Sequence, residues 1–298
     1  MSGLISVITT TFNREDALDA VLRGLSRQHD RNFEVVIADD GSRRATAELI
    51  GQWKSRLGVP LTHVWQEHHG FRAAEARNRA IGASRGEYCV FLDGDCIPRP
   101  DFVAVHRNLA EPGWFVAGNR VLLSPTLTAR VLRDRLDPET WSFAAFVGRR
   151  LHGEINRLLP LVRLPLTGWR KLKANTWEGC RSCNLAVWRS DLDRVDGFDA
   201  TYTGWGKEDS DLVVRLLHAG VRRKDGRFAT GVLHLWHEKE DRSDLPQNEA
   251  KLGQILATDH ILAVEGLSRR NGTMRTKPGR EHETQPGVAA DMRGDVRL

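Results

Sequence analysis

Short apolar runs alternate with amphipathic segments along the first third of the chain. Runs rich in β-branched and other apolar residues predict four strands, at 4–10, 33–38, 61–65 and 87–92. Between them, helical spacing of apolar residues predicts three helices, at 16–25, 45–57 and 73–83. Because strands that alternate with helices pair in parallel, we predict an α/β fold with a doubly wound, mostly parallel central sheet and helices on both faces.

The pattern changes at residue 119, where basic and apolar residues mix without a regular period. We interpret 119–177 as a basic helical insertion between two halves of one domain, 1–118 and 178–267. In the second half the spacing predicts a helix at 211–219 that closes at Gly220, a strand at 231–236 and a helix at 247–267. The last segment, 268–298, is charged and poor in large apolar residues, which predicts a disordered tail.

Composition limits the classes of protein to which the chain could belong. The chain has 298 residues, 40% of them hydrophobic, and a net charge of +5, which suits a globular enzyme with anionic ligands. The basic residues lack interleaved aromatic platforms, so we expect no nucleic-acid partner. Four cysteines are too few for a disulfide framework, and no signal peptide or apolar span is evident, so a cytoplasmic location is expected.

Three predicted strands end in polar segments, Thr10–Arg14, Asp39–Ser42 and Asp93–Asp95. Ligands of such sheets bind outside the carboxyl ends of the strands, so these segments should meet in one crevice. Asp93 and Asp95 could hold a hard divalent cation, Mn²⁺ or Mg²⁺, against phosphate oxygens. Asp-Gly-Asp is also a common turn, but its place at the end of a buried strand favours the ligand site.

Two later motifs could complete the chemistry. His234 or His237 could add an imidazole ligand, which would favour Mn²⁺, although such histidines more often lie on the surface or in the core. Glu208 or Asp209, behind Gly204-Trp205-Gly206, could act as a general base on a hydroxyl while Trp205 stacks on a sugar. The same carboxylates would also complement a helix dipole, and the two roles are compatible.

Five motifs in order carry a family resemblance: Ile5–Arg14, Asp39–Ser42, Ala76–Asn78, Asp93–Asp95 and Trp205–Asp209. Together they resemble family 2 glycosyltransferases with the GT-A fold, over roughly residues 4 to 266. The later part resembles the region shared by β-1,4-galactosyltransferases and chondroitin-type polymerases. The resemblance implies inverting, metal-dependent transfer from a nucleotide diphosphate sugar, most often a UDP-sugar. It further implies a glycan or glycolipid acceptor in bacterial surface polysaccharide or lipopolysaccharide synthesis.

The resemblance also implies residue roles. Nucleotide-sugar binding falls to the first half, through Thr10, Phe12, Asp39, Asp40, Arg77 and Asp93, with Asn184 added from the second half. The metal ligands would be Asp95 and His234, with His237 as the alternative. In the acceptor-binding and catalytic half, Asp209 matches the base, while Glu208 and Trp205 would hold the acceptor. One departure is Ser182, where many relatives carry a glycine, which puts the role of Asn184 in doubt.

Other interpretations remain open at this stage. Cys180 and Cys183 have a spacing that suits zinc or redox chemistry. The segment 157–173 could contact the inner membrane surface, making the protein peripheral, although core packing or an acceptor wall is an equal alternative. Pro160 and Pro165 argue against one continuous helix here. A sugar nucleotidyltransferase would also use paired aspartates, but it leaves the motif at 205–209 without a role. A non-enzymatic membrane- or nucleic-acid-binding module would need neither acidic pair.

Overall fold

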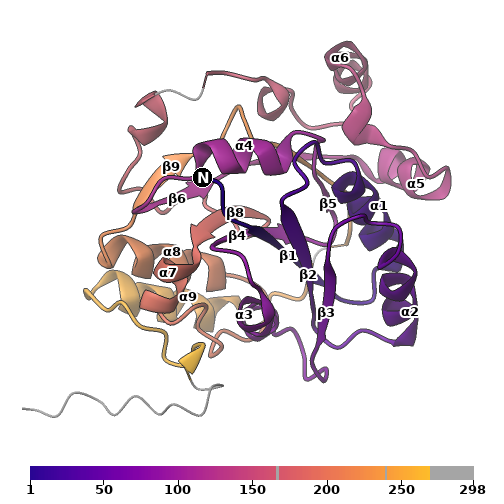
Figure 1. The fold of residues 1–298 in the computed structure, drawn as a ribbon. Coiled ribbons are helices and arrows are strands. Elements are labelled where there is room, and N and C mark those ends of the chain that lie inside the picture. The colour runs from indigo at the N-terminus through magenta and orange to yellow at the C-terminus, as the bar shows by residue number, and fades with distance from the viewer. Residues whose placement is uncertain (166–167, 239, 269–298) are drawn as a thin grey trace, which may run out of the picture.

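A seven-stranded sheet runs through the centre of the molecule, with helices on both faces (Figure 1). The computed structural model describes residues 1–165, 168–238 and 240–268. In spatial order the strands are β3 (Leu61–Trp65), β2 (Phe33–Asp39), β1 (Ile5–Thr11), β4 (Tyr88–Asp93), β8 (Asn184–Trp188), β6 (Trp114–Ala117) and β9 (Arg222–Asp225). Only β8 runs antiparallel to its neighbours, β4 and β6. The predicted mostly parallel α/β class is confirmed.

Each face of the sheet carries its own apolar core. One core packs β-strand residues against α1 (Glu15–Ser26), α2 (Arg44–Trp53) and α4 (Phe102–Leu109). The other packs the sheet against α3 (Ala73–Ala83), α7 (Arg189–Arg194) and α8 (Glu208–His218). Strand alternation decides which side chain enters which core: on β4, Val90 lies in the first and Phe91 in the second. Burial on both faces explains the continuous apolar runs in these strands.

A second, three-stranded sheet joins distant parts of the chain, in the order β5 (Cys96–Ile97), β10 (Val232–His234) and β7 (Arg120–Leu122). His234 lies opposite Cys96 in the antiparallel β5–β10 pair. The backbone N–H of Leu235 donates to the carbonyl of Asp95 at 2.9 Å. The predicted strand at 231–236 is therefore shorter than expected, and it places the histidine segment beside the end of the acidic pair.

The predicted insertion is only partly a separate unit. It contains α5 (Pro125–Arg133), α6 (Phe143–Leu151) and the 3₁₀ helices Pro138–Thr140, Leu159–Leu161 and Gly168–Lys171, but its first residues form β7 of the second sheet. The 157–173 segment forms short turns instead of a long helix, as its prolines require.

Two C-terminal predictions need correction. Helix α8 begins at Glu208, three residues before the predicted start, so both acidic residues of the motif belong to its first turn. Helix α9 (Leu245–Leu256) ends well before residue 267. Beyond it the chain is held by backbone hydrogen bonds from Ala263 to Val195 and from Leu267 to Asp196, and its apolar residues pack on the second core without helical geometry. Of the predicted tail, residues 269–298 lie outside the described part.

Candidate active site

Arg77 on α3 joins three elements at the carboxyl edge of the sheet. Its guanidinium donates to Thr10 Oγ1 at the end of β1 (3.1 Å) and to Asp93 Oδ1 at the end of β4 (3.3 Å). It also donates to Glu208 Oε1 at the start of α8 (3.0 Å). Only 4% of Arg77 is exposed. Two of the three strand ends that the sequence predicts to converge, those of β1 and β4, therefore meet around one buried cation, together with the start of α8.

The buried charges at Arg77 depend on one another. Burial acts to lower the pKa of Arg77, but Glu208 and then Asp93 outweigh it, so the pKa is raised and the guanidinium stays charged. Burial raises the pKa of Glu208, and Asp209 adds to the rise while Arg77 opposes it. Burial likewise raises the pKa of Asp93 against the attraction of Arg77. Removing any one member leaves the others uncompensated in a desolvated site.

Asp209 lies next to Glu208 in the first turn of α8 and is buried. Its carboxylate accepts hydrogen bonds from the backbone N–H of Ser182 and from the hydroxyl of Ser210, both at 3.3 Å. The preceding residues, Gly206 and Lys207, have positive φ angles of 104° and 80°, a tight left-handed turn into the helix. These contacts orient a carboxylate through neutral donors, an arrangement that suits a general base.

Asp95 lies between the two histidines of the β10 segment. Its Oδ2 is 3.6 Å from His234 Nε2 and 3.4 Å from His237 Nε2. Burial lowers the pKa of His234 although Asp95 opposes the shift, so the imidazole is held in the neutral form that binds metals. The sequence treats these histidines as alternatives, whereas the structure brings both to the same carboxylate. One carboxylate and two imidazoles are a donor set that fits Mn²⁺.

Two candidate nucleobase residues, Phe12 and Asp40, directly follow the strands β1 and β2. Phe12 is 40% exposed and stacks on His68, with ring centroids 4.4 Å apart. Asp40 accepts from the Gln66 amide at 2.6 Å and from the Arg72 backbone at 2.7 Å, and burial raises its pKa. Asp40 therefore lies beside the stacked rings of Phe12 and His68.

Asp39 is 1% exposed and faces inward. One oxygen accepts from the backbone N–H of Ser42 and the other lies 2.8 Å from His63 Nε2 on β3. The carboxylate therefore helps to fix the loop that carries Asp40, and its contact with a nucleotide stays a prediction.

Asn184 is also buried, and its side chain is turned into the protein. Its amide nitrogen donates to the carbonyls of Asn119 and Thr230 at 3.0 and 2.6 Å, and its oxygen lies 3.2 Å from His106 Nε2. A side chain at Gly118 would collide with this amide. These contacts hold Asn184 in place at the start of β8, and its contact with the donor stays a prediction.

The two cysteines at 180 and 183 do not form a site together. Both are buried, and the Cys180 thiol donates to the carbonyl of Thr176. Cys183 instead lies beside Cys96 and Asp93, with Arg120 donating to its sulfur at 3.3 Å. The alternative of a zinc site that joins Cys180 to Cys183 is therefore not seen among the described residues.

A cavity of about 470 Å³ opens beside Trp205. Its walls come from three loops: His69–Phe71 after β3, Thr203–Trp205 before α8, and 240–244 before α9. The guanidinium of Arg242 covers the Trp205 ring at 4.4 Å from its centroid, so one face of the ring is already stacked. Gly204, at a φ of 68°, passes so close to the Asp244 carboxylate that a side chain there would collide with it.

Several contributing residues escape sequence reasoning. Gln66 and Arg72 hold Asp40, and the Ser182 backbone holds Asp209. None of them forms a local motif with its partner, since the partners lie 26, 32 and 27 positions away. Cys96 is also missed, although a cysteine directly after the acidic pair is itself a sign of a possible metal ligand.

The doubly wound sheet, with paired aspartates at its carboxyl edge and a second acidic pair joined to them through Arg77, is a fold and site of the GT-A class. A model of glycosyl transferase family 2 matches residues 6–158, and a model described as the N-terminal domain of galactosyltransferase matches residues 170–238. The chain therefore belongs to glycosyltransferase family 2, as the motifs predict.

Individual relatives agree with this assignment. Validoxylamine A glucosyltransferase from Streptomyces hygroscopicus subsp. limoneus is 30% identical over 238 residues, which cover 77% of this chain and 51% of the relative. Chondroitin synthase from Escherichia coli is 26% identical over 246 residues, 76% of this chain and 34% of the relative. The chain thus spans about half, or about a third, of these relatives.

A solved structure shares the fold. The mannosyltransferase from Pyrobaculum calidifontis in complex with GDP-Man and Mn²⁺ superposes with a TM-score of 0.59 at 20% identity, covering 85% of this chain and 65% of that one.

Proposed function

We propose that this chain catalyses inverting transfer of a sugar from a nucleoside diphosphate sugar, with UDP as the favoured nucleotide, to a hydroxyl of a glycan or glycolipid. One observation carries the proposal: Arg77 joins Asp93 of the first acidic pair to Glu208, the neighbour of Asp209. The contact links a carboxylate that we assign to the donor side with one that we assign to the acceptor side. In-line displacement at a sugar carbon needs groups on both sides of the reacting bond.

On the donor side, Phe12 and His68 offer an aromatic surface for the nucleobase, next to Asp40, whose carbonyl oxygen lies 3.1 Å from His68 Nδ1. We assign Thr10 to the same pocket. We assign Asp93 to the ribose, because Arg77 holds its carboxylate in place at the end of β4. Asp39 supports the nucleobase pocket from within the protein, because its carboxylate accepts a hydrogen bond from Ser42 in the loop that carries Asp40.

Asp95, His234 and His237 would hold a divalent cation, Mn²⁺ or Mg²⁺. Such a cation, when bound, offsets the negative charge that develops on the diphosphate leaving group. The mannosyltransferase that shares the fold was solved with Mn²⁺, which supports the same choice here.

On the acceptor side, the cavity beside Trp205 would receive the sugar that is extended. Asp209 would accept the proton of the attacking hydroxyl, and Glu208 would position the acceptor from the adjacent site on α8. Carboxylates of Glu240, Asp241 and Asp244 line the same cavity and can accept hydrogen bonds from sugar hydroxyls.

The cellular setting follows from the family resemblance: synthesis of bacterial surface polysaccharide or lipopolysaccharide, at the cytoplasmic side of the inner membrane. No helix in the described ranges is long and apolar enough to cross a membrane. In the 157–173 segment, Leu159 and Leu172 are 64% and 83% exposed, which supports peripheral contact. The basic residues support it less, because Arg163 and Lys171 pair with Asp101 and Glu111 and Arg170 is buried.

The test is calorimetric titration of the purified protein with UDP-, GDP-, CMP- and dTDP-sugars, first with Mn²⁺ and then with a chelator. Binding of one sugar nucleotide that needs the cation supports the proposal and names the donor. If the binding affinity is unchanged by the chelator, the metal has no part in donor binding and this part of the proposal fails. If no sugar nucleotide binds, with or without an acceptor present, the transferase assignment for this chain fails.

A further inference from the structure

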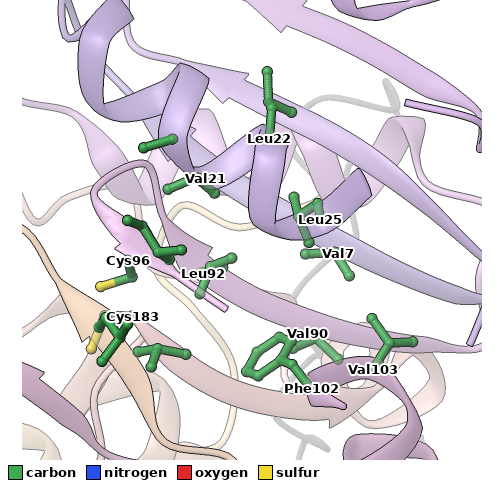
Figure 2. Close-up of a cluster of buried hydrophobic side chains, with 14 of the residues drawn as sticks. Val7, Val21, Leu22, Leu25, Val90, Leu92, Cys96, Phe102, Val103 and Cys183 are labelled. Carbon is green, nitrogen blue, oxygen red and sulfur yellow. The ribbon is translucent and has the colours of Figure 1, made fainter. Parts of the chain in front are cut away.

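A thiol lies at the base of the proposed metal site. Cys96 follows Asp95 directly and pairs with His234 across β5 and β10. A carboxylate oxygen of Asp95, the Cys96 sulfur and a ring nitrogen of His234 all lie within 4.8 Å of one another. Cys96 has no exposed surface, while Asp95 and His234 are partly open to solvent. Figure 2 shows Cys96 and Cys183 near each other at the margin of an apolar cluster.

Two separations between the candidate ligand atoms fall in the range of a tetrahedral ion. Cys96 Sγ is 3.4 Å from Asp95 Oδ1, and His234 Nε2 is 3.6 Å from Oδ2, the other oxygen of the same carboxylate. Around a tetrahedral zinc, ligands at roughly 2.0–2.3 Å from the ion lie about 3.3–3.8 Å apart. Around an octahedral Mg²⁺, adjacent ligands lie only about 3.0 Å apart.

We propose that Cys96, Asp95 and His234 form a three-ligand site that binds Zn²⁺ in competition with the Mn²⁺ or Mg²⁺ of the transfer reaction. This inference rests on the proposed function, because Asp95 and His234 are shared with it. Coordination replaces the thiol proton of Cys96, so one proton is released and a sulfur–metal bond forms without any change in oxidation state.

The consequence is inhibition by zinc. A thiolate favours Zn²⁺ over the harder Mn²⁺ and Mg²⁺, which prefer oxygen. Because Asp95 and His234 would be ligands of both ions, a zinc ion held there excludes the Mn²⁺ or Mg²⁺ that the transfer needs. Cys96 therefore makes the site sensitive to the kind of cation available, and a serine or alanine at this position would remove that sensitivity.

A second thiol group nearby is a poorer cation site. Asp93, Cys96 and Cys183 also lie within 4.8 Å of one another. However, Arg120 donates to Cys183 at 3.3 Å and Arg77 donates to Asp93 at 3.3 Å. A cation placed there would face two guanidinium groups. Cys183 is therefore the matched control for Cys96: a buried cysteine in the same cluster (Figure 2) without the predicted role.

The test is a Co²⁺ titration of the metal-free full-length chain, with the thiolate-to-cobalt charge-transfer absorption as the readout. We expect the band in the wild type and in Cys183→Ser, its displacement by Zn²⁺, and its absence in Cys96→Ser and Cys96→Ala. Zn²⁺ affinity should fall at least about tenfold in both Cys96 variants, while Mn²⁺ affinity changes less than about threefold. Circular dichroism melting of each variant shows that it is folded.

The inference is overturned if the band persists in both Cys96 variants, or if wild type binds Mn²⁺ yet shows no band. Mn²⁺ binding followed by electron paramagnetic resonance separates this from the proposed function. Loss of Mn²⁺ binding in Asp95→Ala supports the catalytic metal site whatever Cys96 does. A wild type that shows the thiolate band but no Mn²⁺ binding would support the zinc site and contradict the proposed catalytic metal.

Discussion

Arg77 is the residue on which the charge balance of the site depends. It is buried with two carboxylates in contact, Glu208 and Asp93, and both have a pKa raised by burial. Uncompensated buried charge is costly, which explains why an arginine sits in an otherwise Ala-rich helix.

Arg77→Met should therefore destabilise the fold by about 3 kcal/mol, because it leaves Glu208 buried without its cation. The double variant Arg77→Met/Glu208→Gln should recover part of this loss, since the charge left behind is gone. Urea unfolding of the wild type, both single variants and the double variant measures the coupling. Additive losses would show that the two side chains do not depend on each other.

Asp209→Asn tests the general base. The amide keeps the size of the side chain and can still accept from Ser182, but it cannot take a proton. The turnover number should fall by about 10² to 10⁴-fold while donor affinity stays within about threefold, as expected for loss of one proton-transfer group. Asp193→Asn, the same change at an exposed salt bridge, is the control. Near-normal turnover of Asp209→Asn would assign the base elsewhere.

At the scale of elements, a histidine links α4 to β8. His106 is fully buried and reaches Asn184, and burial lowers its pKa to about 4 from an ordinary 6.5. The unfolded chain therefore binds the proton more readily, so this contribution to stability is complete above pH 6.5 and is lost as the pH falls toward 4.

Between pH 7 and pH 4 the loss amounts to about 3 kcal/mol for the wild type. His106→Gln keeps a donor for Asn184 but does not titrate, so its stability should vary less with pH by this amount. The measurement is urea unfolding at several pH values, with His152→Gln, an exposed site, as the control. Parallel pH profiles for wild type and His106→Gln would contradict the assignment.

Membrane contact can be tested at the 157–173 segment. Its exposed leucines remain available for such contact, whereas several of its basic side chains are paired or buried within the protein. Wild type should co-sediment with anionic lipid vesicles, and Leu159→Ser/Leu172→Ser should bind about tenfold more weakly, because each leucine loses apolar burial. Leu256→Ser on α9, also an exposed leucine, should bind like wild type. Equal binding of all three proteins would remove this contact.

At the scale of the whole molecule, periodicity predicts the first half of the fold well. The strands β1 to β4 and their helices form locally patterned units, and each appears within a few residues of its predicted range. The segment after α9 was predicted as helix because its apolar residues pack on the core at helix-like spacing, while its backbone bonds go to the loop at 195–196. Spacing alone does not distinguish these cases.

The same contrast holds for the site residues. Thr10 and Asp93 come together around Arg77 as predicted for segments at strand ends, because such segments share one edge of the sheet. Asp39 and Asn184 belong to motifs too, yet they face inward, and only the three-dimensional packing decides that. The pairing of β5 with β10, which brings Asp95 to both histidines, joins segments far apart in the chain and has no local signature.

The pairing of β5 with β10 leads to a prediction about the thermal stability of the whole molecule. Asp95 lies in the part matched by the family 2 model, and His234 and His237 lie in the part matched by the galactosyltransferase model. A cation bound to all three would join these two parts, and binding to the native state alone adds about 2.7 kcal/mol at 100 times the dissociation constant.

For a chain of this size, Mn²⁺ should raise the melting temperature by at least about 2 °C, and a chelator should reverse the shift. Asp95→Ala and His237→Ala should lose it, while His152→Ala, at an exposed histidine away from the site, should keep it. Differential scanning calorimetry of the four proteins gives the result. An undiminished shift in Asp95→Ala would mean that Mn²⁺ stabilises the protein from another position, and the three-residue site would then have to be abandoned.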